Sequence, residues 1–123
     1  MNETPAPGIR LIRVSGVLGG DGSARLLRMI DSQLMLASSG HRRLQAVIID
    51  MEGVEAVHRG GPEALSHIRY ACDRRGIDVV LAGCLGPLST SLSLRERLRG
   101  FPNFPTAQAA LAALESRRLS DVE

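Results

Sequence analysis

The chain has 123 residues, of which 44% are hydrophobic, and its formal net charge is +2. This length suits one domain with a single core, and so small a charge argues against a nucleic-acid partner. No apolar run approaches the roughly 20 residues that a membrane span needs. Because residues 1–8 are polar and proline-rich rather than a signal peptide, we expect a cytoplasmic protein that begins with a flexible tail.

The first predicted strand covers residues 9–14, where two arginines indicate an edge of the sheet or partial exposure. A diglycine ends its continuation, and Asp21 or Ser23 can then cap a helix over residues 23–39. Apolar residues at spacings of three and four give this helix one buried face. Further apolar residues widen that face, which we interpret as an ordinary core face; a homodimer contact is the alternative.

The central predicted strand opens with the unbroken apolar run 46–49 and is closed by Asp50. Such a run, rich in branched residues, suits a strand buried on both faces. Asp50 is the best-placed carboxylate of the chain, and we expect it to cap the following turn. A Gly-Gly-Pro sequence at 60–62 then starts a helix over residues 61–75, since proline is tolerated in a first helical turn. The diglycine should leave backbone amides uncovered there, where function tends to gather in α/β folds.

The remaining pattern predicts a third strand over residues 77–82 and a third helix over residues 88–99. The prolines of residues 101–105 allow at most a very short edge strand. Thr106 should cap a last helix over residues 107–118.

Strands and helices alternate along the chain, which indicates an α/β domain with a largely parallel sheet. We therefore expect a four-stranded, mostly parallel or mixed sheet packed with about four helices. The domain would cover residues 9–118, and residues 119–123 would form a polar tail.

Residues with catalytic or metal-binding chemistry are sparse and do not form motifs. The three histidines (His41, His58 and His67) show no metal-ligand spacing. Cys72 and Cys84 have none either, so we expect two buried thiols in a reduced protein. The chain contains no complete GxGxxG or GxSxG motif, and it has no lysine for a Walker sequence. We therefore predict a non-enzymatic module without a cofactor.

Four segments together resemble the STAS domain of bacterial anti-sigma-factor antagonists. Residues 16–19 (GVLG) occupy the place of a G-x-L-D signature, and residues 47–51 (VIIDM) match a buried V-L-D-L strand. Residues 58–61 (HRGG) occupy the place of a D-S-S-G turn that opens the second helix. Residues 104–114 are similar to the closing segment, so that the resemblance covers about residues 9–114.

The resemblance implies the STAS fold and a role in freeing a sigma factor. In that family the second serine of the turn is phosphorylated by an anti-sigma factor that is also a serine kinase. Here Gly60 stands at the acceptor position and has no hydroxyl, while Arg59 and His58 replace the other serine and the aspartate. Gly19 replaces the aspartate of G-x-L-D, and only Gly61 is retained from the turn motif. We therefore predict no phosphorylation at this turn.

The altered turn defines a candidate partner-binding surface that is more positive than the family pattern. We hypothesise that it meets an acidic partner: a serine-kinase-type anti-sigma factor or a related regulatory protein. Alternatives are an accessory or scaffold subunit of a transporter or signalling complex, and a small-ligand sensor with a pocket near Gly19 and Gly60. The candidate partner-binding residues are His58, Arg59, Gly60, Gly61, Gly19, Asp21 and Arg69.

Overall fold

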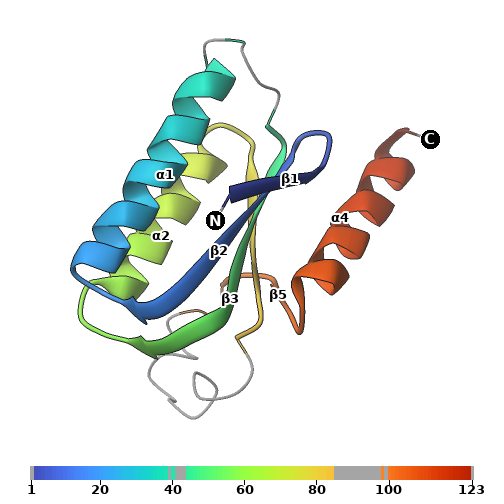
Figure 1. The fold of residues 1–123 in the computed structure, drawn as a ribbon. Coiled ribbons are helices and arrows are strands. Elements are labelled where there is room, and N and C mark those ends of the chain that lie inside the picture. Colours follow the sequence, from blue (N-terminus) through green and yellow to red (C-terminus); the bar gives the residue numbers. More distant parts are fainter. Residues whose placement is uncertain (1, 39, 41–43, 85–97, 99, 123) are drawn as a thin grey trace.

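A computed structural model describes residues 2–38, 40, 44–84, 98 and 100–122. A mixed sheet of five strands lies at its centre, in the order β1-β2-β3-β4-β5 (Figure 1). The strands are β1 (Asn2–Ala6), β2 (Ile9–Leu18), β3 (Ala46–Val57), β4 (Asp78–Ala82) and β5 (Asn103–Phe104). Strand β1 is antiparallel to β2, and the other neighbouring strands are parallel. The described helices are α1 (Asp21–Ser38), α2 (Gly61–Asp73) and α4 (Ala107–Val122).

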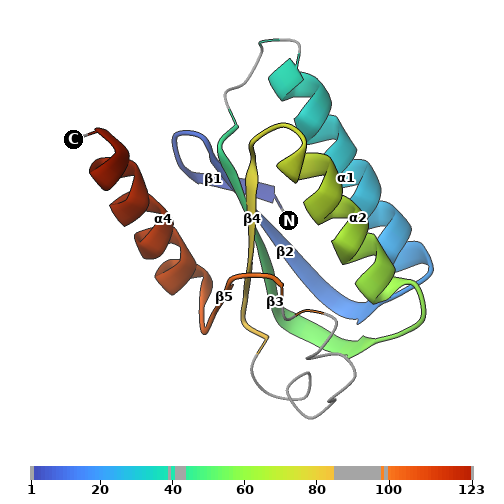
Figure 2. The same cartoon turned by 180° about the vertical axis from the view of Figure 1, so that it is seen from behind.

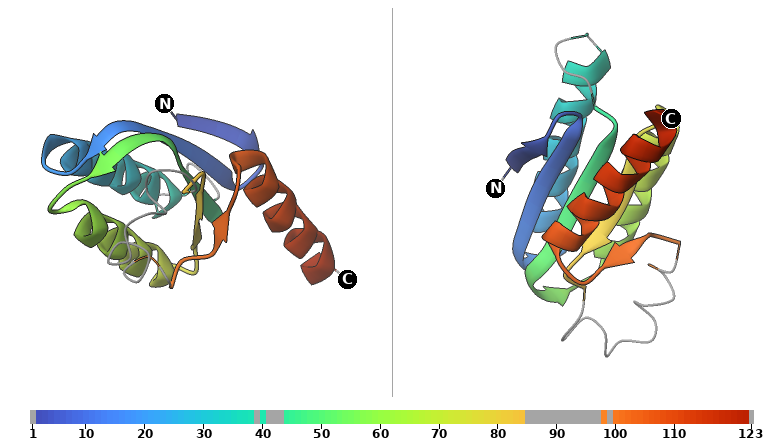
Figure 3. Two further views of the ribbon diagram at one scale, coloured as in Figure 1. Left: turned by 90° about the horizontal axis from the view of Figure 1, so that it is seen from below. Right: turned by 90° about the vertical axis from the view of Figure 1, so that its right-hand side faces the viewer.

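The helices form layers on both faces of the sheet. Helices α1 and α2 lie side by side on one face, and α4 lies on the other (Figures 2 and 3). Along β3, Val47 and Ile49 face α1 and α2, whereas Ala46 and Ile48 face the α4 layer. This alternation explains the unbroken apolar run of the central strand, because both faces of it are buried. The predicted α/β class is therefore confirmed.

The expected loose tail over residues 1–8 is wrong, because β1 pairs with β2. Strand β2 supplies the hydrogen-bond partners of β1, and the proline-rich sequence of β1 did not indicate this pairing. Prolines are tolerated in β1 because it is an edge strand. The extra strand also makes the sheet five-stranded rather than four-stranded. Strand β2 consequently lies inside the sheet rather than at its edge. Partial exposure, the other interpretation of its arginines, is confirmed, since Arg10 is half-buried and Arg13 is exposed.

Several predicted boundaries move. Strand β3 continues to Val57 instead of stopping near Asp50, because the whole length of β2 runs beside it. Helix α1 begins at Asp21. Ser23 does not cap this helix, because its buried hydroxyl has no hydrogen-bond partner within the described part of the chain. Helix α4 runs on to Val122 in place of the expected tail, since neither glycine nor proline follows to stop it.

The end of the chain otherwise follows the prediction. The edge strand β5 is only two residues long, and the Thr106 hydroxyl accepts a hydrogen bond from the Ala109 N–H at 3.0 Å, capping α4. The predicted helix over residues 88–99 lies outside the described residues, apart from Leu98. No described helix is both long and apolar enough to cross a membrane.

Candidate functional site

Two turns meet where the parallel strands β2 and β3 end. The Leu18 carbonyl at the end of β2 accepts a hydrogen bond from the His58 N–H at 2.9 Å. Gly19 packs directly on His58, because a Cβ atom added to Gly19 would lie 2.8 Å from the His58 Cβ. Carboxyl ends of neighbouring strands are where α/β sheets place their functional loops. The structure thus brings Gly19 together with the turn of residues 58–61, here called the β3–α2 turn.

The β3–α2 turn is held by its own backbone groups. Gly60 adopts a left-handed conformation with φ = 93°, which favours glycine. Its N–H donates to the Glu63 carboxylate at 3.1 Å, and the Gly61 N–H donates to the His58 carbonyl at 3.0 Å. The expectation of uncovered amides is therefore wrong for both glycines, since each N–H already has an acceptor.

Gly61 is required for close packing rather than for an unusual backbone angle. An added Cβ atom would lie 2.7 Å from the Leu18 carbonyl oxygen and 2.7 Å from Val57 Cγ1. Gly61 is buried, and Pro62 behind it is buried as well. The start of α2 is thus pressed against the ends of β2 and β3, which fixes the position of the turn.

The side chains of the turn face solvent. His58 and Arg59 are both exposed, and within the described part of the chain Arg59 forms no ion pair. No described heavy atom lies within 4 Å of the position that a Gly60 Cβ would take. The turn therefore presents the exposed Arg59 side chain on a braced backbone.

Two predicted site residues, Arg69 and Asp21, form no ion pair with this cluster among the described residues. Arg69 is two turns further along α2, where its guanidinium pairs with Asp73 at 3.7 Å and stacks over the Phe101 ring at 5.1 Å. Its charge is therefore engaged away from Arg59, contrary to the expected joint positive surface. Asp21 is exposed at the first position of α1, and no ion pair joins it to the turn among the described residues.

Asp50 has a structural role, but it does not cap a turn as predicted, because β3 continues beyond it to Val57. It is only 5% exposed, and its Oδ1 accepts the Glu52 N–H at 3.0 Å. Burial, and then the negative charge of Asp50, raise the pKa of the Cys84 thiol to about 11. Asp50 therefore stabilises the backbone of β3 where its pairing with β2 changes register, and its charge adds to burial in keeping the Cys84 thiol protonated.

Sequence reasoning missed concave sites between β2 and α1 and between α1 and α2. A half-open pocket of about 130 Å³ lies between β2 and α1, and neither Gly19 nor Gly60 lines it. Nothing in the sequence signals it, since it arises from irregular pairing of β2 with β3. Among the described residues, no group of three or more His, Cys, Asp or Glu side chains could hold a metal ion.

Comparison with known proteins identifies the family. Similar solved structures include a sulfate transporter family protein from Wolinella succinogenes (17% identity, TM-score 0.71, covering 92% of this chain and 89% of that chain). A SulP transporter STAS domain from Vibrio cholerae has 16% identity and a TM-score of 0.71, covering 95% of this chain and 88% of that chain. The unphosphorylated anti-sigma factor antagonist SpoIIAA has 15% identity and a TM-score of 0.67, covering 95% of this chain and 96% of that chain. No curated protein matches the sequence. A family model for the STAS domain matches residues 4–110, most of the chain, and this protein therefore belongs to the STAS domain family.

Proposed function

We propose that this STAS domain is a non-enzymatic interaction module of the anti-sigma-factor-antagonist type. Its partner would be a serine-kinase-type anti-sigma factor, or a related regulator, in the cytoplasm. The observation that carries the proposal is the β3–α2 turn, which is exposed, braced by backbone hydrogen bonds, and positively charged at Arg59. A turn already fixed in one conformation loses little entropy on binding, which favours its use as a contact surface.

Binding at this turn would be constitutive. Phosphorylation adds a charge of about −1.5 to −2, which is enough to disrupt an interface. Gly60, at the position of the acceptor serine, has no hydroxyl to accept a phosphate. The module would therefore stay in its binding-competent form, controlled by its abundance or by its partner.

An accessory role in a transporter or scaffold is the second candidate. The SulP transporter STAS domain is as similar in fold as SpoIIAA is. The two roles differ in the proteins that should bind, so identification of the partner separates them.

A Gly60→Ser variant tests whether the turn lacks only the serine hydroxyl that would accept a phosphate. Serine at a left-handed position costs about 1–2 kcal/mol, so the matched control is Gly76→Ser, beyond the opposite end of α2. Gly76 is also left-handed, with φ = 70°, and also has nothing within 4 Å of its added Cβ. Both variants should lose similar stability, but in native cytoplasm supplied with ATP only Gly60→Ser should become phosphorylated.

The same samples identify the partner by pull-down and mass spectrometry. Wild-type protein should capture a serine-kinase-type anti-sigma factor without itself carrying phosphate. Capture of transporter or scaffold components, with no kinase and no phosphate on either serine variant, would contradict the antagonist proposal and support the accessory role.

Arg59→Glu should weaken binding to the captured partner by more than about tenfold, because charge-complementary contacts contribute that much. Arg28→Glu is the matched control, since Arg28 is also exposed but lies on α1 and changes the net charge equally. Isothermal titration calorimetry at low and physiological salt measures both. Equal affinities of the two variants would rule out Arg59 as a specific contact.

A further inference from the structure

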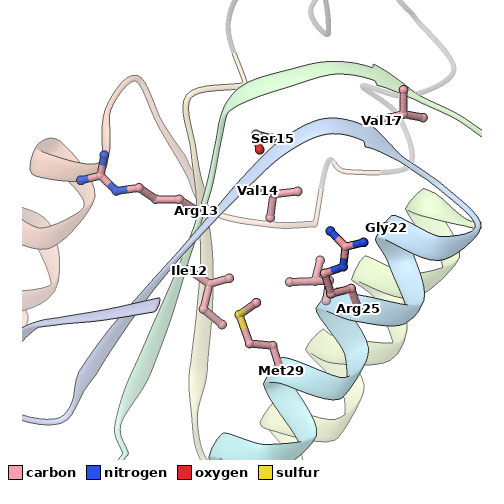
Figure 4. A pocket seen from close by; sticks show the side chains of 9 residues that line it. Ile12, Arg13, Val14, Ser15, Val17, Gly22, Arg25 and Met29 are labelled. Carbon is pink, nitrogen blue, oxygen red and sulfur yellow. The ribbon is translucent and has the colours of Figure 1, made fainter. Parts of the chain in front are cut away.

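The pocket between β2 and α1 combines apolar side chains with polar ones, two of which are arginines. Ile12 and Val14 line it from β2, and Leu26, Met29 and Arg25 line it from α1 (Figure 4). Leu26 is buried and Val14 and Met29 are half-buried. The walls are therefore mixed, with apolar side chains beside polar ones, among them Ser15 and Arg25.

The backbone of β2 is irregular beside this space. The pairing of β2 with β3 shifts register twice, between Arg13 and Ser15 and again between Gly16 and Val17, and Gly16 has φ = 77°. Such bulges bend a strand and increase its twist, here beside α1. At one end, Gly22 lies so close to β2 that an added Cβ would be 2.5 Å from the Val17 carbonyl oxygen. The pocket is thus preformed and closed on that side.

Arg25 supplies the polar contact. Figure 4 shows its guanidinium rising from α1 toward the level of Val14, whereas the Arg13 side chain points away, toward the α4 side. Within the described part of the chain Arg25 forms no ion pair. A carboxylate is the natural partner of a guanidinium, because the two planar groups can share parallel hydrogen bonds.

We propose that this pocket, with a volume of about 130 Å³, binds a small monocarboxylate with a compact apolar body. The apolar body would lie among Ile12, Leu26 and Met29, and the carboxylate would pair with Arg25. This site is distinct from the β3–α2 turn, and it does not depend on the function proposed for that turn.

Sodium benzoate is the probe, titrated into the ¹⁵N-labelled full chain while amide shifts are followed by NMR. Benzamide has the same shape without the charge, and acetate has the charge without the apolar body. We expect saturable shifts at β2 and α1 with benzoate. Benzamide should bind at least about tenfold more weakly, because a hydrogen bond to a charged group is worth that factor or more. Acetate should bind at least about tenfold more weakly as well, because it buries no ring.

Arg25→Gln should weaken benzoate binding by about tenfold, while Arg28→Gln, on the same helix but outside the pocket, should leave it unchanged. Measurements on the wild-type protein alone can overturn the proposal. They would do so if benzamide or acetate bound with the same affinity as benzoate. Unchanged binding by Arg25→Gln, or no saturation with benzoate, would overturn it as well. Val14→Phe fills the pocket and should abolish benzoate binding, while its amide spectrum should remain that of a folded protein.

Discussion

At pH 8, Cys72 and Cys84 should react with iodoacetamide at least about 100-fold more slowly in the folded protein than in the chain unfolded by urea, because the reactive species is the thiolate. Both are free and buried. Burial, and next the charge of Asp73, raise the pKa of Cys72 from 9.0 to about 11 despite the opposing effect of Arg75; Cys84 reaches about 11 as well. Mass spectrometry of timed samples measures both rates. Rapid labelling of either native thiol would show that it is accessible.

The same pKa shifts predict a fall in stability at alkaline pH. Unfolded thiols lose their protons near pH 9, whereas the folded ones keep them up to about pH 11. The unfolded state then binds fewer protons, so the free energy of unfolding decreases as pH rises through this window.

Urea midpoints at pH 8, 9 and 10 measure this decrease, and the chain is well suited to the test because it contains no lysine. A Tyr70→Phe background removes the one phenol and keeps the ring that stacks on Arg74. In that background, Cys72→Ala with Cys84→Ala should flatten the pH dependence. An equally steep dependence without the two thiols would contradict the assignment.

The elements that the sequence predicts well are those whose own residues specify them. The run of residues 46–49 reads as a strand buried on both faces, and the structure packs it between two layers. Thr106 is a local capping signal, and it makes the expected hydrogen bond. In both cases the information lies within a few adjacent residues, so no knowledge of distant contacts is needed.

Strand β1 could not be predicted because its partner, not its composition, makes it a strand. The sequence NETPA is polar and contains a proline, yet pairing with β2 satisfies its backbone along an edge that tolerates proline. The extension of β3 to Val57 has the same origin, since it depends on the length of β2 beside it. Both errors concern pairing between segments, which composition does not encode.

The candidate site was predicted in part. The sequence grouped Gly19 with residues 58–61 in one candidate partner-binding set, and the structure brings Gly19 into contact with His58. Arg69 was grouped with Arg59 by charge alone, and charge does not show that Asp73 and Phe101 already engage it. The roles of these residues in partner binding stay predictions that the pull-down and the Arg59→Glu variant test.

Gly61→Ala should lower the free energy of unfolding by about 2–3 kcal/mol, the upper part of the range for overpacking. The added methyl would press on the Leu18 carbonyl oxygen and on Val57 Cγ1, both at 2.7 Å. That carbonyl cannot move away freely, because it accepts the His58 N–H. Urea unfolding followed by circular dichroism measures the loss.

Gly60→Ala is the informative comparison, because it tests the second reason for a glycine, which is a left-handed backbone conformation. Its methyl would meet no atom within 4 Å, but φ = 93° disfavours any side chain, at about 1–2 kcal/mol. If the diglycine existed only to permit a sharp turn, Gly60→Ala would be the more damaging change. We expect the reverse order, because Gly61 is needed for contact between α2 and the ends of β2 and β3.

A double-mutant cycle separates the two collisions at Gly61. Val57→Ala removes Cγ1 and leaves the Leu18 carbonyl in place, so Gly61→Ala should be less destabilising in that background than in the wild type. Partial rescue would show that both contacts oppose the methyl, and full rescue would assign the whole effect to Val57. No rescue would place the strain in the backbone contact with Leu18, and the glycine of the turn would then serve the approach of one main chain to another.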